Sequence, residues 1–281
     1  MIDLLFEPAV ATAAAAVIGL LVGSFVNVVI HRLPRMLERG WRAQCAELEG
    51  KAPVEMPRYD LVVPRSTCPH CDHRIRAIEN IPVISWLALR GRCSACKSPI
   101  SARYPIVELI AAALGALAIS TFGPTWQGVA ACGLLWTLLA LTFVDLDTQL
   151  LPDDLTLPLL WAGLVINSFG LFVPLHEAVI GAVAGYLSLW SVYWAFKLVR
   201  GKEGMGYGDF KLLAALGAWL GWKTLPAIVL MSSAVGAIVG LTLMLVQHRD
   251  HREPLPFGPY LAVAGAITLF AGGQLVALYL P

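Results

Sequence analysis

Residues 126–145 read WQGVAACGLLWTLLALTFVD, a run of nineteen residues without a charged side chain that ends on an aspartate. A helix needs about 20 apolar residues to cross the hydrocarbon core of a bilayer, so this run has the length of a transmembrane helix. Similar runs recur along most of the chain, which is 58% hydrophobic and only 14% charged over its 281 residues. This composition excludes an ordinary soluble globular protein and predicts an all-α polytopic membrane protein.

Eight apolar segments resemble membrane spans. They lie at about residues 8–30, 104–122, 126–144, 155–172, 177–199, 210–222, 225–246 and 258–280. The sixth is short and contains glycine. The first is not a secretory signal, because Asp3 and Glu7 stand where a basic region would be and no small-residue cleavage site follows. We therefore expect eight transmembrane helices, the first of which stays in the mature protein.

The distribution of Lys and Arg indicates the orientation. Thirteen of the 20 lie between Arg32 and Arg103, and cytoplasmic loops of membrane proteins carry an excess of these residues. Residues 31–103 are therefore predicted to be cytoplasmic, and eight alternating spans place both termini on the opposite side. The same topology puts six further basic residues in the cytoplasm, namely Lys197, Arg200, Lys202, Lys211, Arg249 and Arg252.

One long polar insertion interrupts the predicted membrane helices. It divides the chain into a first transmembrane helix (1–30), a loop domain (31–103) and a helical bundle (104–281). The stretch from Glu38 to Pro64 is charged and rich in Gly and Pro, so we expect a loop there with one short helix at about 40–49.

The second half of the insertion contains two CxxC pairs. The cysteines are Cys68, Cys71, Cys93 and Cys96, with 21 residues between the pairs. This spacing is close to that of a structural zinc site, in which two tight turns supply four thiolates to one tetrahedral ion. The pattern predicts a structural Zn²⁺ in the loop domain. Two alternatives stay open: a pair of disulfides, which a reducing cytoplasm opposes, and replacement of one thiolate by His70 or His73.

Acidic residues cluster at the ends of two predicted spans. One cluster reads DLDTQLLPDD (145–154) and the other GYGDFK (206–211). Acids at a membrane boundary are costly and suggest function, and both clusters face the cytoplasm in the predicted topology. Asp145 directly follows the apolar run, while Gly206 and Gly208 leave room beside Asp209 for a close backbone approach or a positive φ.

Asp145 and Asp209 are therefore a candidate catalytic pair. Two carboxylates that meet across helices can share a proton, one acting as base toward water while the other polarises a peptide carbonyl. From the residues alone, other interpretations remain. Asp209 could be a helix N-cap, as could Asp153 or Asp154 after Pro152. The acids could also form a proton or ion relay in a transporter, or the chain could be a membrane scaffold with a zinc-bound docking loop.

In these motifs the chain resembles the type IV prepilin peptidases, a family of bacterial inner-membrane enzymes with a Gly-x-Gly-Asp motif. The resemblance covers nearly the whole chain and is weakest at about 40–63. Besides the CxxC pairs, it is carried by GSFVNVVIHRLP (23–34), ENIP (79–82) with Ser85 and Trp86, RYP (103–105) with Glu108, DLDTQLLPD (145–153) and GYGD (206–209). Each motif is weak by itself, but their order and spacing are specific.

The resemblance implies an activity, substrates and site residues. The family's catalytic aspartates fall on Asp145 and Asp209, and its zinc ligands fall on the four cysteines of the CxxC pairs. The implied substrates are prepilins and type II secretion pseudopilins, which are cleaved after a glycine between a basic leader and an apolar helix. Asp147, Asp153 and Asp154 could attract the basic leader.

The resemblance also implies a second activity. Family members with the long cysteine-bearing loop methylate the new N-terminal amine with S-adenosylmethionine. The chain has no Gly-rich turn of a nucleotide-binding domain, so methylation is expected from the resemblance alone and no residue is assigned to the cofactor. The implied location is the bacterial inner membrane with both termini in the periplasm. Partners are the substrates and the lipid bilayer, not nucleic acid, and no oligomeric state is predicted.

Overall fold

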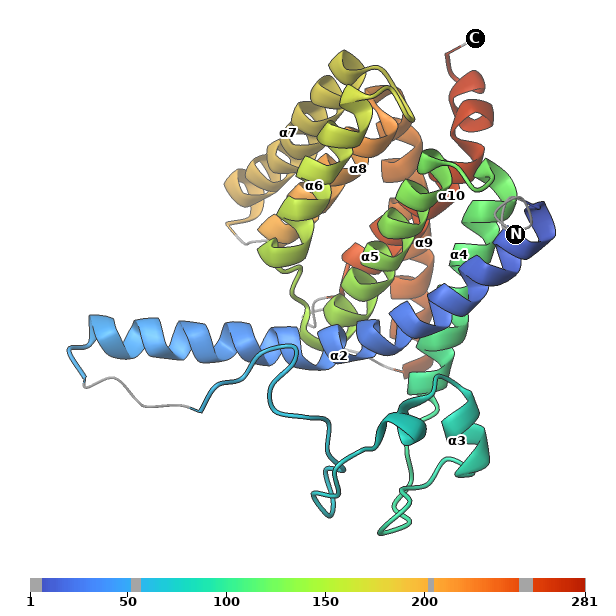
Figure 1. Cartoon of the computed structure of the whole chain (residues 1–281). Coiled ribbons are helices and arrows are strands. Elements are labelled where there is room, and N and C mark those ends of the chain that lie inside the picture. The colour runs from blue at the N-terminus through green and yellow to red at the C-terminus, as the bar shows by residue number, and fades with distance from the viewer. Residues whose placement is uncertain (1–6, 52–56, 202–204, 248–254, 281) are drawn as a thin grey trace. The chain divides into compact units, whose positions relative to one another are not determined.

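The computed structural model describes residues 7–51, 57–201, 205–247 and 255–280 (Figure 1). Within these residues the chain is largely helical, with two isolated β-bridges and no β-strand. The predicted all-α class is therefore confirmed. Some residues used in the predictions lie outside the described ranges, namely Asp3 in the signal-peptide argument and Lys202, Arg249 and Arg252 in the orientation argument.

The chain forms two compact units, Met1–Pro124 and Thr125–Pro281. The first unit contains α2 (Pro8–Leu48), η1 (Ala77–Asn80), α3 (Ile84–Ala88) and α4 (Arg103–Phe122). The second contains α5 (Trp126–Thr148), α6 (Asp153–Ser168), α7 (Leu175–Arg200), α8 (Tyr207–Leu220), η2 (Trp222–Thr224), α9 (Leu225–Gln247) and α10 (Gly258–Ala277).

The first unit is built on α2 and α4, which pack through small residues. A Cβ added to Gly19 would lie 2.6 Å from the carbonyl oxygen of Ala111, and one added to Gly23 would lie 2.6 Å from Cα of Glu108. Nδ2 of Asn27 donates a hydrogen bond of 3.1 Å to a carbonyl oxygen near the start of α4. Close backbone contact and interhelical hydrogen bonds drive helix association in a bilayer, so this stripe of α2 fixes the position of α4.

α2 is longer than the predicted first span. It runs through Pro34 to Leu48, so the separate short helix expected at 40–49 is wrong and most of that stretch is the end of α2. The residues after Pro34 are mostly good helix formers, and Arg42 forms an i, i+4 ion pair with Glu38 at 2.6 Å. Most of these side chains are exposed. This end of α2 therefore depends on local helix propensity more than on packing.

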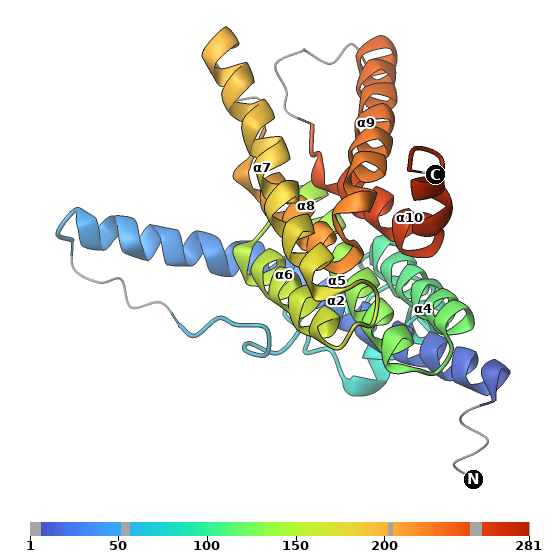
Figure 2. The same ribbon diagram turned by 90° about the horizontal axis from the view of Figure 1, so that it is seen from above.

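α8 is the centre of the second unit. Between Asp209 and Leu220 every side chain is buried except that of Lys211, which is half-buried. α6 and α7 lie alongside α8 (Figure 2), and α10 also contacts it. A Cβ added to Gly181 of α7 would clash with the carbonyl oxygen of Gly217 on α8. The two backbones are therefore in direct contact.

A buried amide side chain fastens the connection between α6 and α7 to α8. Asn167 is 1% exposed. Its Nδ2 donates to the carbonyl oxygens of Ala218 at 2.8 Å and Trp219 at 3.0 Å, and its Oδ1 accepts the N–H groups of Phe172 and Val173, both at 3.1 Å. These bonds use the full hydrogen-bonding capacity of the amide, so its burial leaves no unsatisfied polar atom.

Each predicted span falls on a helix, but not every helix is long enough to cross a bilayer. Among the described residues, six segments are long and apolar enough: α2, α4, α5, α7, Trp222–Val246 and α10. α6 has 16 residues and α8 has 14, which gives lengths of about 24 and 21 Å against a hydrocarbon core of about 30 Å. The chain is a multi-pass membrane protein. Six of the eight predicted spans fall on segments of full spanning length, and the other two, including the short sixth, fall on the shorter helices α6 and α8.

Replacing Gly181 with alanine is expected to lower the free energy of unfolding by the roughly 1–3 kcal/mol typical of overpacking. The added methyl group would meet a backbone carbonyl of α8, which can move only if the helix moves. Thermal unfolding of the full-length protein in detergent measures the effect. Gly133→Ala is the matched control, because a Cβ there meets nothing within 4 Å. Equal melting temperatures for the two variants would contradict the role of this contact.

Candidate active site and metal centre

The two CxxC pairs form two turns with the same hydrogen bonds. In each, the first cysteine donates its N–H to the carbonyl oxygen five residues later, at 2.9 Å for Cys68 and 2.8 Å for Cys93. The residue after the second cysteine has a positive φ, 53° at Asp72 and 61° at Lys97, and donates its N–H back to the first cysteine's carbonyl oxygen. We call these turns the zinc knuckles, because two such turns can supply four thiolates to one ion.

Four thiols converge between the knuckles. They belong to Cys68, Cys71, Cys93 and Cys96, whose Sγ atoms all lie within 4.8 Å of one another. The Sγ atoms of Cys68 and Cys96 are 3.8 Å apart, and Zn–S bonds of about 2.3 Å in a tetrahedron require about this separation. All four thiols are free, so the disulfide alternative finds no support. The backbone amide of His70 lowers the pKa of the Cys68 thiol to about 6, while the neighbouring thiols help to raise the pKa of the Cys71 thiol to about 12.

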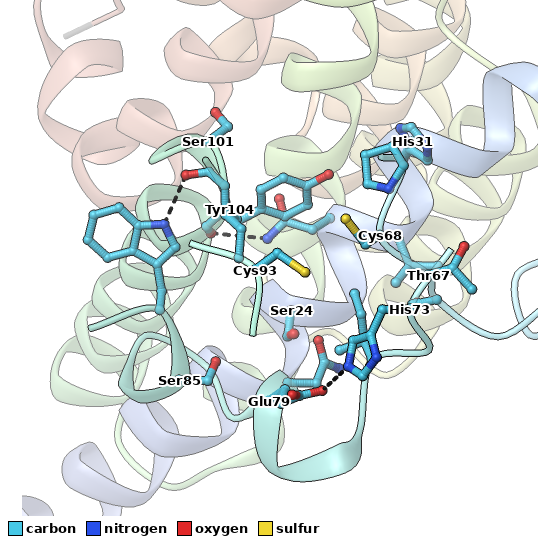
Figure 3. A pocket seen from close by; sticks show the side chains of 18 of the residues that line it. Ser24, His31, Thr67, Cys68, His73, Glu79, Ser85, Cys93, Ser101 and Tyr104 are labelled. Carbon is cyan, nitrogen blue, oxygen red and sulfur yellow. Dashed lines mark hydrogen bonds and ion pairs between the residues drawn. The ribbon is translucent and has the colours of Figure 1, made fainter. Parts of the chain in front are cut away.

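The histidines of the first knuckle stand apart from the four thiols. Nε2 of His73 lies 3.3 Å from Oε2 of Glu79 and 3.2 Å from Oγ of Ser94 (Figure 3), and His70 is exposed. Oε2 of Glu79 also accepts the backbone N–H of Arg76 at 2.8 Å, and this bond, with Ser94 and His73, lowers the pKa of Glu79 to about 2. His73 therefore connects the knuckle to η1 rather than completing the metal site.

A cavity of about 640 Å³ lies beside the knuckles in the first unit (Figure 3). Small-molecule sites in proteins have volumes of about 300–1,000 Å³, so this cavity can hold a cofactor. One face of α2 lines it with Ser24, Asn27 and His31, and the start of α4 contributes Tyr104 and Glu108. The sequence predicted no cofactor contacts, because the residues that meet here come from segments far apart in the chain.

Asp145 lies in the last turn of α5 and is 4% exposed. Its Oδ2 accepts the backbone N–H of Gly258, the first residue of α10, at 3.0 Å. The start of a helix carries unpaired N–H groups and a partial positive charge, so it is a favourable place for a carboxylate. α5 ends directly afterwards at Gln149, whose φ is 55° and whose N–H bonds to the carbonyl oxygen of Asp145.

Asp209 is the third residue of α8 and is 7% exposed. Gly206 is the N-cap of the helix, so the alternative in which Asp209 caps it is wrong. The carboxylate is hydrogen-bonded by the backbone of Gly206, and the charge of Asp145 acts on it. The charges of the two predicted catalytic side chains therefore interact. Asp145 lies at the start of α10, and Asp209 lies in the first turn of α8.

Leu151 packs between the starts of α8 and α10, a position that sequence analysis missed. A Cβ added to Gly208 would lie 2.6 Å from Cβ of Leu151, and one added to Gly258 would lie 3.0 Å from its Cδ2. Neither Gly206 nor Gly208 has a positive φ, so Gly208 is required by this packing and not by an unusual backbone conformation. The Gly-Pro pair at 258–259 is a helix-start signal that could have pointed to Gly258.

The other acids of the first cluster have different surroundings. Oδ1 of Asp153 lies 2.6 Å from Nζ of Lys211 in an ion pair. Pro152 is the N-cap of α6 and no side chain caps the helix, so the expectation that Asp153 or Asp154 does so is wrong. Asp147 is exposed. Asp145 is the buried acid of this cluster.

Comparison with known proteins covers both units. Residues 17–122 match the bacterial peptidase A24 N-terminal domain, and residues 132–241 match the type IV leader peptidase family. The prepilin leader peptidase/N-methyltransferase of Aeromonas hydrophila is 60% identical over 93% of this chain and 91% of its own length. That of Stutzerimonas stutzeri is 58% identical over 98% of this chain and 95% of its own length. The chain belongs to the prepilin leader peptidase/N-methyltransferase family. No solved structure matches it significantly.

Membership of the prepilin leader peptidase/N-methyltransferase family confirms the resemblance and the predicted enzyme class. The transporter and scaffold alternatives find no support in these comparisons. In this family member the thiols and the cavity lie in the unit that matches the N-terminal domain. Asp145 and Asp209 lie in the unit that matches the leader peptidase family.

Gly258→Ala is expected to lower kcat for cleavage of a pilin precursor by at least about tenfold, or ~1.4 kcal/mol in the barrier. The added methyl group would lie 2.7 Å from Oδ2 of Asp145 and would displace that carboxylate. Gly273→Ala, on the same helix but with nothing within 4 Å of the added Cβ, is the control. An unchanged kcat in Gly258→Ala would show that cleavage does not depend on this contact.

Proposed function

We propose that this chain is a membrane aspartyl endopeptidase that removes the basic leader from type IV prepilins and type II secretion pseudopilins after a glycine. We further propose that it methylates the new N-terminal residue with S-adenosylmethionine. The observation that carries the peptidase assignment is the burial of Asp145 and Asp209 at the N-termini of two helices that contact each other, α10 and α8. The relatives named prepilin leader peptidase/N-methyltransferase support both activities.

In the proposed mechanism Asp145 and Asp209 work as one acid–base pair that shares a proton. The ionised carboxylate takes a proton from water as the water oxygen attacks the peptide carbonyl carbon, and the protonated carboxyl donates to the carbonyl oxygen. The carbon–nitrogen bond then breaks. The leaving amine takes one proton from the pair, and a hydroxyl of the tetrahedral intermediate returns its proton to the pair as the new carboxyl group forms. The N–H of Gly258 holds the Asp145 carboxylate in place throughout.

The proposed substrate suits cleavage at the membrane boundary. Asp145 lies at the end of a helix long and apolar enough to span the bilayer. A prepilin with its leader in the cytoplasm and its apolar helix in the bilayer presents the scissile bond at the same level. Among the acids proposed to attract the basic leader, Asp153 is already paired with Lys211. The exposed Asp154 is therefore a better candidate for that role than Asp153.

We propose that the protein lies in the bacterial inner membrane with residues 31–103 in the cytoplasm and both termini in the periplasm. The concentration of Lys and Arg in that segment supports this orientation. In this orientation the short helices α6 and α8 each return the chain toward the periplasm, and α7 and α9 each bring it back to the cytoplasm. A bilayer accommodates short helices by local thinning at modest cost.

The four cysteines are proposed to hold one structural zinc ion. Four thiolates complete a tetrahedron and leave no open position, so the ion would supply rigidity and no reactive group. Cys68 and Cys93 also line the cavity of the first unit. Zinc would therefore keep one wall of that cavity in shape.

Asp145→Asn and Asp209→Asn are each expected to lower the rate of precursor cleavage by about 10²–10⁴-fold, because an amide cannot carry the shared proton. The shift of a leader-bearing pilin on a gel measures cleavage by the purified full-length protein. Glu47→Gln, an exposed acid of α2, is the control and should keep its kcat. Retained cleavage in either of the first two variants would reject the mechanism. Thermal unfolding shows whether a variant that has lost cleavage is still folded.

Elemental analysis is expected to give about one zinc ion per chain. Replacement of all four clustered cysteines by serine should abolish binding, because a neutral hydroxyl is a poor zinc ligand. Cys45→Ser is the control, since that thiol is exposed on α2 and lies outside the cluster. The site would be refuted by equal zinc contents in the wild type and the quadruple variant.

A further inference from the structure

The cavity of the first unit has two acidic side chains in its wall, Glu79 and Glu108. Glu79 lies beside the first knuckle, where His73 binds it (Figure 3). Glu108 lies in the second turn of α4, a helix long and apolar enough to cross the bilayer. Glu79 therefore belongs to the part of the cavity wall beside a knuckle, and Glu108 to the part that α4 supplies.

Glu108 is held by groups from two other segments. It is 7% exposed, and its Oε2 accepts the backbone N–H of Val83 at 2.7 Å. Ser24 of α2 also hydrogen-bonds to it. The contact between Gly23 and Cα of Glu108 keeps α2 directly against this turn of α4. The carboxylate is thus fixed in position at the cavity wall.

The N–H of Val83 is directed at Glu108 by an unusual turn. Val83 has φ 60° and ψ −50°, and the N–H of Ile84 bonds to the carbonyl oxygen of Pro82 across it. This is a γ-turn with positive φ, a strained conformation that β-branched residues avoid. Such strain persists only where the surrounding structure requires it, and here it supplies a hydrogen bond to a buried carboxylate.

The cavity wall also contains an indole ring in a fixed orientation. Nε1 of Trp86 donates to the carbonyl oxygen of Ile100 at 3.2 Å. Gly91 lies against the ring, because a Cβ added there would lie 2.9 Å from Cζ2 of Trp86. A fixed indole offers a surface on which a flat heteroaromatic ring can stack. The adenine of S-adenosylmethionine is such a ring, so the volume, the aromatic wall and the carboxylates fit this cofactor.

We propose that this cavity is the methyl-transfer site, in which S-adenosylmethionine occupies the region beside Trp86 and Glu108 receives the amine of the cleaved pilin. The proposal rests on the methyltransferase part of the proposed function. The amine is the product of the cleavage reaction and belongs to a membrane-embedded helix, so it approaches the part of the cavity wall that α4, itself a candidate membrane span, supplies. An α-amino group with a pKa of about 8 arrives protonated, and the fixed carboxylate binds that charge.

Glu108 then has a defined part in the transfer. The amine must lose a proton before its nitrogen lone pair can form a bond to the methyl carbon. The carbon–sulfur bond breaks with its electron pair going to the positive sulfur, and the proton shed by the nitrogen passes to Glu108. Glu79 is poorly suited to this task, since the N–H of Arg76 and its other partners lower its pKa to about 2.

The test compares Glu108→Gln with the wild-type full-length protein in lipid nanodiscs. Glutamine keeps an oxygen that can accept the N–H of Val83 but cannot take a proton. Glu38→Gln, an exposed residue of α2 paired with Arg42, is the matched control. Three readouts are needed: gel-shift cleavage of the precursor, the mass of the mature pilin N-terminus, and photocrosslinking of radiolabelled S-adenosylmethionine followed by peptide mapping.

We expect Glu108→Gln to cleave normally and to retain the radiolabel, while methylation falls by about 10²-fold or more. In the wild type the label should map to peptides of the first unit that line the cavity. Wild-type methylation rates in Glu108→Gln, or label confined to residues 125–281, would overturn the proposal.

Two further outcomes are distinguishable. A wild-type product with an unmodified amine would remove the methyltransferase part of the proposed function itself. If Glu108→Gln also lost cleavage, the variant would be misfolded, and the position of the label in the wild type would decide for or against the cavity.

Discussion

Helices in a bilayer gain little by hiding apolar side chains from one another, because the lipid tails are equally apolar. Both units of this protein use glycine to bring helix backbones into contact instead. Gly23 places α2 against α4, and Gly181 with Gly217 places α7 against α8. These contacts fix the positions of helix ends. The Gly23 contact lies at the turn of α4 that carries Glu108, and the Gly181–Gly217 contact lies further along the helix that carries Asp209, so both sites depend on glycine packing.

The buried acids share one solution to the cost of burial. A carboxylate removed from water must receive hydrogen bonds, or the penalty is several kcal/mol. In each case a backbone amide at or next to the start of a helix is the donor, from Gly258 at α10, Gly206 at α8 and Val83 at α3. A main-chain donor carries no proton that exchanges during the reaction. It can hold an acid still without competing for the role of proton carrier.

The parts of these sites that sequence could predict are those whose chemistry requires particular residue types at short spacing. The four cysteines lie in two CxxC pairs, and Asp145 stands at the end of an apolar run. Gly258 and Leu151 could not be found this way, because their importance comes from contacts between segments that are distant in the chain. The length of α2 could not be predicted for another reason. Its charged second half has few packing partners, and the Gly and Pro residues nearby in the sequence indicate a loop more strongly than the other residues indicate a helix.

α5 connects one side of the membrane to the other without a break, and both of its ends are fixed. Thr125 accepts the N–H of Gly128 at its start, and the left-handed Gln149 closes its end. With 3.6 residues per turn, each residue added to or removed from this helix would rotate the Asp145 side chain by about 100° around the axis. The residue count of α5 therefore sets an angle as well as a depth. A change in bilayer thickness can be met by tilting the helix, whereas an error in rotational phase would turn the carboxylate away from its partners.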